Sequence, residues 1–215
     1  RRVHCYNKVR AYRVDLQAMC DSLVADSRDS CMIMYNDPIV WNEGRQVLGE
    51  MIKVYSSDST IRQAHVIGQA LSIEKCDDEE HYNQISANVL DAYFAEGALR
   101  DIEAVGNVRI IYYPIDEKDS SLMFLNYTET DTMRTSLTAD RQLDRIWTSK
   151  HVSDMYPMSQ IPTDKFKLPM FAWFEELRPK DKNDIFVWRG KDESQKLKPT
   201  TRGEAPRQRL KIQDE

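Results

Sequence analysis

The chain has 215 residues and a formal charge of −5, and 41% of its residues are hydrophobic, which is enough for one sizeable core. Residues 191–215 hold seven Lys and Arg against five Asp and Glu, so the rest of the chain carries −7, and this acidic body argues against a nucleic-acid partner. No run of about 18 apolar residues is present, so the sequence predicts no transmembrane helix.

The first part of the chain, residues 1–41, is expected to form a first pair of strands. Residues 9–20 alternate imperfectly between apolar and polar side chains, residues 27–30 supply a turn, and Cys31–Tyr35 is typical of a short apolar strand. Pro38 interrupts this pattern. Because proline cannot donate a hydrogen bond to a sheet, we expect it at a strand start or at an exposed edge.

Further strands are expected in pairs. Residues 39–41 open a second unit, in which residues 46–55 and 61–73 read as strands. The clearest unit spans residues 82–113, where a short turn at residues 95–98 separates two apolar runs. These patterns predict hairpins rather than helices.

The units are copies of one another. A shift of 38 residues places Gly49 on Ala87, Ile52 on Leu90 and Gly68 on Gly106 without a gap. A weaker fourth copy begins at residues 122–126 and closes at residues 155–157, and residues 1–41 make a plausible first copy. The sequence therefore predicts an all-β fold of about four stacked hairpin repeats.

After the repeats the pattern changes. Residues 161–190 are punctuated by proline and contain two aromatic clusters, and we expect them to cap the last open hairpin, because a stacked fold leaves unpaired backbone at its ends. Residues 191–215 have almost no apolar content and are predicted to be a disordered tail.

The cysteines favour neither a metal site nor a redox motif. Cys5, Cys20, Cys31 and Cys76 contain no CxxC pair and show no regular spacing. Cys20 takes the position that Gly49 fills in the next copy, so a small buried thiol is favoured there. A disulfide stays chemically open if the protein is exported.

The remaining polar residues give no catalytic pattern. His4, His65, His81 and His151 lie in different copies, and a solvated surface role is favoured for His65. The acidic run at residues 77–80 lacks the donor spacing and the glycine of a calcium loop, so we expect a solvated connection. The sequence predicts a non-enzyme without metal or cofactor; a polysaccharide-active enzyme would need carboxylates to converge from distant copies.

What recurs instead is apolar character at every second position of the expected strands. These positions are ordinary core, or they are two facing walls of an apolar trough that holds acyl chains, and the sequence does not separate the two. The candidate lipid-binding residues are Ile52, Val54, Ala64, Val66, Ala70, Leu90, Ala92, Phe94, Ile102, Ala104, Val108 and Ile110.

The pattern that runs from residues 87–90 through residues 105–108 resembles the OstA-like (LptA) family of lipopolysaccharide transport proteins, and in particular its Bacteroidetes type. The order and spacing of several short motifs make the resemblance fairly specific over residues 5–188. The further motifs are residues 20–23 (CDSL), 37–41 (DPIVW), 82–86 (YNQIS), 110–114 (IIYYP), 178–180 (RPK) and Asp184–Phe186.

This resemblance implies an open β-jellyroll of V-shaped strands over residues 1–160, followed by a capping segment and a tail. It implies a protein of the periplasm, or one associated with the outer membrane, that carries lipopolysaccharide acyl chains in an apolar groove. The implied partners are lipopolysaccharide and other transport proteins, joined end to end by strand addition, or further copies of the chain. The chain begins Arg1-Arg2-Val3 without Met, as expected of a trimmed or partial product. A structural scaffold with a closed core that binds protein partners is the alternative.

Overall fold

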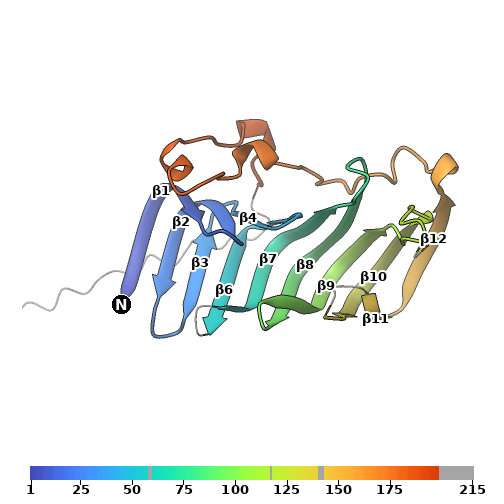
Figure 1. The fold of residues 1–215 in the computed structure, drawn as a ribbon, viewed down its shortest axis with the longest axis horizontal. Coiled ribbons are helices and arrows are strands. Elements are labelled where there is room, and N and C mark those ends of the chain that lie inside the picture. The colour runs from blue at the N-terminus through green and yellow to red at the C-terminus, as the bar shows by residue number, and fades with distance from the viewer. Residues whose placement is uncertain (58–59, 117, 140–142, 199–215) are drawn as a thin grey trace, which may run out of the picture.

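The computed structural model describes residues 1–57, 60–116, 118–139 and 143–198, which build one antiparallel sheet (Figure 1). No helix among these residues is long and apolar enough to cross a membrane. The predicted all-β fold is confirmed.

The strands are β1 (Arg2–Tyr12), β2 (Gln17–Asp26), β3 (Cys31–Tyr35), β4 (Ile39–Asn42), β5 (Arg45–Leu48), β6 (Met51–Ser57), β7 (Thr60–Lys75), β8 (Tyr82–Ala95), β9 (Ala98–Tyr112), β10 (Phe124–Leu137), β11 (Leu143–Thr148) and β12 (His151–Pro157). Four short 3-10 helices follow: η1 (Met158–Gln160), η2 (Glu175–Leu177), η3 (Asp184–Phe186) and η4 (Glu193–Gln195).

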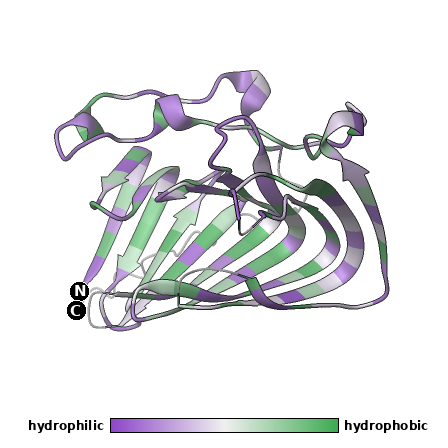
Figure 2. Cartoon of the chain, turned by 45° about the vertical axis from the view of Figure 1, so that its right-hand side comes forward, coloured by the Kyte–Doolittle hydropathy of each residue, from purple (hydrophilic) through white to green (hydrophobic). Residues whose placement is uncertain are grey.

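Each layer of the stack is one long strand or two short strands placed end to end. β2 pairs with both β3 and β4, β7 pairs with both β6 and β5, and β10 pairs with both β11 and β12. The layers bend near their middle, and Figure 2 shows the resulting curved stack. The structure therefore has the predicted V-shaped, jellyroll-like arrangement of hairpin units.

Alternate layers bend at two consecutive residues with left-handed backbone. The partner strand opposes each such pair with a single residue, so the bends are β-bulges that turn the strand. The 38-residue repeat superimposes the bend of β7 on the bend of β9. The four pairs, with φ between 47° and 81°, are Asn7-Lys8, Asn36-Asp37, Gly68-Gln69 and Gly106-Asn107.

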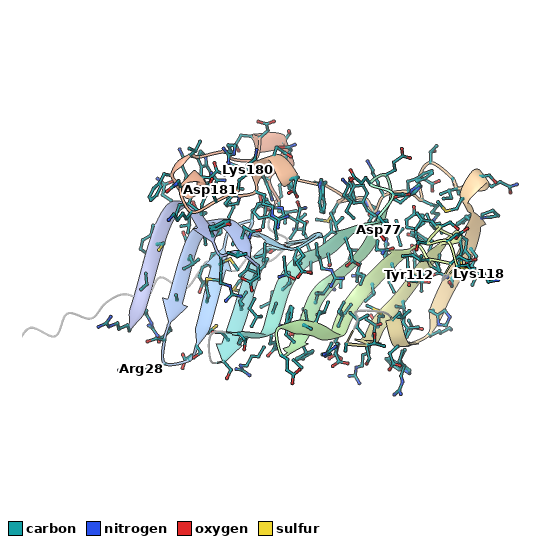
Figure 3. All side chains as sticks on the ribbon, viewed as in Figure 1. Arg28, Asp77, Tyr112, Lys118, Lys180 and Asp181 are labelled. Atoms are coloured by element: carbon teal, nitrogen blue, oxygen red, sulfur yellow. The ribbon has the colours of Figure 1, made fainter. Side chains whose placement is uncertain are left out.

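The bends divide the sheet into two arms whose inner faces look toward each other. The uncovered arm contains β3, β6, β11 and the halves of the long strands next to them, and the covered arm contains β4, β5, β12 and the other halves. In Figure 3, Arg28 lies at the free end of the uncovered arm, in the turn between β2 and β3, whereas Asp77 and Lys180 lie toward the opposite side of the molecule.

Residues 158–198, called the strap below, run back over the covered arm from β12 to β1 (Figure 1). Beneath the strap, Trp41, Ile73 and Tyr113 are at most 1% exposed. We expected residues 161–190 to cap the last open hairpin, but they cover the outer face of an entire arm. The physical reason is that this outer face is itself apolar, and a sheet that is apolar on both faces needs a second layer.

Two glutamines, each 0% exposed, fasten the strap to the sheet. The side-chain amide of Gln46 donates to the carbonyl oxygen of Ala172 at 2.7 Å and accepts from the backbone amide of Phe174 at 2.8 Å. Gln84 makes the same pair of bonds with strap residues 166–168, both at 2.9 Å. A carboxamide offers both a donor and an acceptor, so each glutamine pairs with extended backbone as a neighbouring strand would.

The far end of the strap is held by β1. The guanidinium of Arg10 donates to the carbonyl oxygens of Leu177 at 3.0 Å, Asp184 at 2.9 Å and Val187. Its side chain is 1% exposed and lies 3.6 Å from the Asp184 carboxylate. One buried cation therefore joins three points of the strap to the first strand.

Residues 191–198 lie against the bends instead of forming part of the predicted disordered tail. The ammonium group of Lys191, 4% exposed, pairs with Asp37, and Asp37 also accepts from the amide of Leu197 at 3.3 Å. Gln69 donates to the carbonyl oxygen of Lys198 at 2.8 Å. The rest of the predicted tail, residues 199–215, lies outside the described residues.

Candidate functional site

The structure places all twelve candidate residues on the inner face, between the two arms. Nine of them, from both arms, are at most 6% exposed and belong to one apolar cluster. Ala92 and Phe94 are half-buried and pack against that cluster, and Ala64 lines the small cavity beside it. Apolar residues at every second position of the strands therefore form one continuous surface, although they lie far apart in the sequence.

Several residues of this surface were not predicted. Most of them precede β6, where the strands bend at positions without glycine and the alternation of apolar and polar residues is interrupted. The alternation resumes on either side of each bend, and this is the pattern that could have identified them. The buried members that are not among the candidate lipid-binding residues are Ala18, Cys20, Leu23, Met34, Val40, Ile61, Ala87, Leu99 and Met133, and burial was predicted for Cys20 alone.

The two inner faces are in contact with each other in this structure. The cavity between them has a volume of about 60 Å³ and is lined from the uncovered arm by Ile52 and Leu90 and from the covered arm by Val40 and Val47. Small-molecule pockets usually measure roughly 300–1,000 Å³. An acyl chain would therefore need the arms to move apart.

A larger cavity, of about 1040 Å³, lies outside the sheet between the bends and strap residues 188–197. No local pattern in the sequence predicts this cavity, because its walls are more than a hundred residues apart in the chain. Its charged groups are balanced in number, so it offers no net charge to a ligand. They are Lys8, Lys53, Lys191 and Lys196 against Asp21, Asp37, Glu50 and Glu193.

Titratable groups do not gather into a catalytic arrangement in the described part of the chain. No group of three or more His, Cys, Asp or Glu there could hold a metal ion. All four cysteines are free. Burial raises the pKa of the Cys20 thiol to about 12, with a smaller contribution from Asp21, and it raises that of Cys76 to about 12. Both thiols therefore stay protonated and unreactive at neutral pH.

Two polar features of the sequence have structural roles. His65 lies on the outer face of the uncovered arm, where its Nδ1 is 2.7 Å from the carboxylate of Asp91, which also accepts from Gln63 at 3.0 Å. The acidic run at residues 77–80 is exposed, and Asp78 accepts hydrogen bonds from backbone amides of its own turn. His65 is thus paired rather than simply solvated.

The inner face changes character at the β10 end of the stack. Thr128, Thr130 and Thr135 are 7–8% exposed, and they stand opposite Ile110, Val108 and Ile102 of β9 in the register. Cross-strand partners share a face of the sheet, so these hydroxyls point inward. On the covered arm the apolar surface therefore ends between β9 and β10, whereas on the uncovered arm it continues to Met133 of β10.

Both ends of the sheet leave strand edges without a partner among the described residues. β1 pairs only with β2, and β11 and β12 pair only with β10. Apolar side chains are exposed on these edges, including Val3 at 54%, Tyr6 at 70% and Val152 at 68%. Such edges are templates for pairing with another strand.

Comparison with known proteins gives a limited result. No protein-family model matches the chain, and no curated protein matches it. Among solved structures, the chain is similar to LptH from Pseudomonas aeruginosa, described as the LptA-homologous periplasmic component of the conserved lipopolysaccharide transport device. The two are 11% identical, the match covers 65% of this chain and 92% of that one, and the TM-score is 0.47. At these values the function of LptH does not carry over to this chain.

Proposed function

We propose that this chain is a non-enzymatic lipid-transport protein of the periplasm, which holds acyl chains of lipopolysaccharide between its two arms on their way to the outer membrane. The observation that carries the proposal is the apolar inner face, which continues from β1 to β9 and is formed by both arms. The resemblance of the sequence to the OstA-like family supports the same substrate.

Loading requires the arms to separate, and the two arms differ in their freedom to move. The strap holds the covered arm from outside through Gln46, Gln84 and Arg10. In the described part of the chain, strap residues 188–197 approach the uncovered arm near the bends. We therefore propose that the uncovered arm moves about the bends while the covered arm stays fixed.

The unpaired edges suggest how partners bind. A strand added to β1 or to β11 and β12 would continue the main-chain hydrogen bonds and would extend the inner face beyond this chain. We propose that the partners are other transport proteins or further copies of this chain, joined end to end in this way.

A structural scaffold with a closed core is the second candidate. It is favoured by the close contact of the inner faces, with Ile52 and Val66 at 1% exposure and a cavity of only about 60 Å³ between the arms. In that case the inner face is ordinary core, and the edges bind proteins only.

A matched pair of neighbouring aromatic residues tests the proposal. Phe94 points to the inner face and Tyr93, 38% exposed, to the outer face of the same strand. With a photoreactive phenylalanine at each position in turn, and purified lipopolysaccharide as the probe, we expect cross-links from position 94 and none from position 93. Equal labelling, or no labelling together with no lipid co-purifying by mass spectrometry, would favour the closed scaffold.

A further inference from the structure

On the covered arm the inner face is apolar over most of the stack and polar at one end. On β9 the inner positions of both arms are apolar, as at Ile102, Ala104, Val108 and Ile110. On β10, Met133 belongs to the apolar cluster and Leu137 packs against it, and both lie in the uncovered arm. The polar inner residues of β10 are Asn126, Thr128, Thr130 and Thr135.

The last layer continues this polar surface. The hydroxyl of Thr128 is 2.9 Å from that of Ser153 on β12, and it donates to the side-chain oxygen of Asn126 at 2.7 Å. Thr130 is 2.9 Å from the hydroxyl of Ser149. The hydrogen bonds join neighbouring strands of one arm and do not cross the space between the arms.

Thr135 extends the polar surface to the uncovered arm, where its hydroxyl donates to the carbonyl oxygen of Arg145 at 3.0 Å. The uncovered arm is mixed in the β10 layer, because Met133 and Leu137 belong to or pack against the apolar cluster on the same face.

Packing a hydrocarbon chain on such a polar surface is unfavourable. Each hydroxyl has one donor and two acceptor sites, so a hydroxyl that spends its donor within the network keeps acceptor capacity toward the space between the arms. Covering that capacity with an acyl chain removes water and supplies no hydrogen bond in return, which is unfavourable. The β1–β9 section of the covered arm has fewer such groups; Ser72, 6% exposed, is one of them.

We propose that Thr128 and Thr130 are specificity-determining residues that keep acyl chains off the covered arm beyond β9. This inference rests on the proposed function, since it concerns the position of a lipid between the arms. On the covered arm, the hydrocarbon of a bound lipid occupies the β1–β9 section, and only its polar part lies over β10 and β12. The two ends of the covered arm therefore differ in what they accept.

The experiment uses the full chain and a diacyl phospholipid with a photoreactive diazirine at the chain terminus. After irradiation, mass spectrometry maps the labelled residues. In the unaltered protein we expect labels on inner positions of β6 to β9 and none on residues 151–155. In the double variant Thr128→Val, Thr130→Val, which keeps side-chain shape, we expect labelling of residues 151–155 to appear.

Two controls separate this effect from a general loosening of the fold. Thr132→Val lies on the same strand but opposite Val105 on the outer face, and it should leave the pattern unchanged. Thr130→Ser keeps the hydroxyl and should also leave it unchanged. If the double variant loses its β6–β9 labels through misfolding, the single variant Thr128→Val, which should bring labels to residues 151–155, replaces it.

The outcomes discriminate between the two proposals. Labels spread evenly from β6 to β12 in the unaltered protein would overturn the boundary and leave the lipid-binding face standing. An unaltered pattern in every folded valine variant would also overturn the boundary. Absence of inner-face labels in all proteins would overturn the boundary together with the proposed function.

Discussion

The two arms are built largely from the same strands, yet their outer faces are opposite in character. In the covered arm, four consecutive residues of β7, from Ala70 to Ile73, are buried, because the strap covers one face and the other arm covers the other. In the uncovered arm the outer face carries a row of charged and polar partners. This row runs across five strands through Lys53, His65, Asp91, Glu103 and Arg134.

This difference shows that one strand can change from one-sided to two-sided burial at a bend. A strand buried on both faces reads as a continuous apolar run, whereas a strand with one solvated face alternates. Residues 60–67 of β7 show the second pattern and residues 70–73 the first. The inner face is common to both arms, so the strap alone accounts for the difference.

The largest expected effect comes from removing a strap anchor. Phe174 is 2% exposed and packs on the covered arm, so Phe174→Ala should lower the free energy of unfolding by about 3–5 kcal/mol. Tyr93→Ala, on the outer face of the uncovered arm at 38% exposure, should cost about 1 kcal/mol or less. Chemical denaturation of both variants measures the difference.

Equal costs for the two variants would contradict the asymmetry of the arms. A two-step transition in Phe174→Ala, with the strap released before the sheet unfolds, would show that the strap stabilises the covered arm separately from the rest of the sheet. Hydrogen exchange at the amide of Phe174, which is hydrogen-bonded to Gln46 in the folded protein, reports the strap step separately.

The sequence predicts the inner face well because its signal is local and repeated. Residues such as Leu90 and Ile102 alternate within one strand, and the 38-residue shift repeats the pattern. The position of the strap has no such signal, because Gln46 and Phe174 are 128 residues apart. A buried glutamine also looks like a surface residue in the sequence, since only its tertiary partners make burial favourable.

The bends show the same limit. Glycine occupies the bends of β7 and β9, where the 38-residue shift places Gly68 on Gly106. The bends at Asn7-Lys8 and Asn36-Asp37 contain no glycine, although asparagine tolerates left-handed backbone better than most residues. The first copy therefore alternates imperfectly in the sequence while its strands bend in the same way.

A second prediction concerns these bends, where the two arms meet. Gly106 has φ +81°, and a Cβ added there would lie 2.5 Å from the side-chain nitrogen of Asn88. Gly97 has φ +79° and nothing within 4 Å of an added Cβ. Gly97→Ala should cost about 1–2 kcal/mol from backbone strain alone, and Gly106→Ala should cost about 1–3 kcal/mol more from the clash.

Thermal or chemical denaturation of the two variants measures this difference, and the double variant Gly106→Ala, Asn88→Ala locates its origin. Because the clash involves the Asn88 side chain, the double variant should recover much of the additional cost. Similar costs at Gly97 and Gly106 would mean that the bend adapts easily, and that its geometry does not hold the arms at a fixed angle.

The smallest expected effect is a local release of the strap in acid. Hydrogen bonds from Arg189 and from the backbone amide of Lys180 lower the pKa of Asp184 to about 2. A carboxylate whose pKa is lower in the folded state contributes its full stability above the unfolded pKa of about 3.9, and that contribution is lost as the pH falls toward about 2. We therefore expect the amide of Lys180 to lose protection against hydrogen exchange between about pH 4 and pH 2. Asp184→Asn should remove this step, because the asparagine side chain does not titrate.

Asp26, in the uncovered arm, provides the control. Its pKa is also lowered, by hydrogen bonds from the amide of Arg28 and the side chain of Arg2, but it lies at a turn and holds no second layer. Its protonation should affect the turn alone, so a strap that loosens equally in Asp26→Asn would show that the anchor at Asp184 is not what fixes the covered arm.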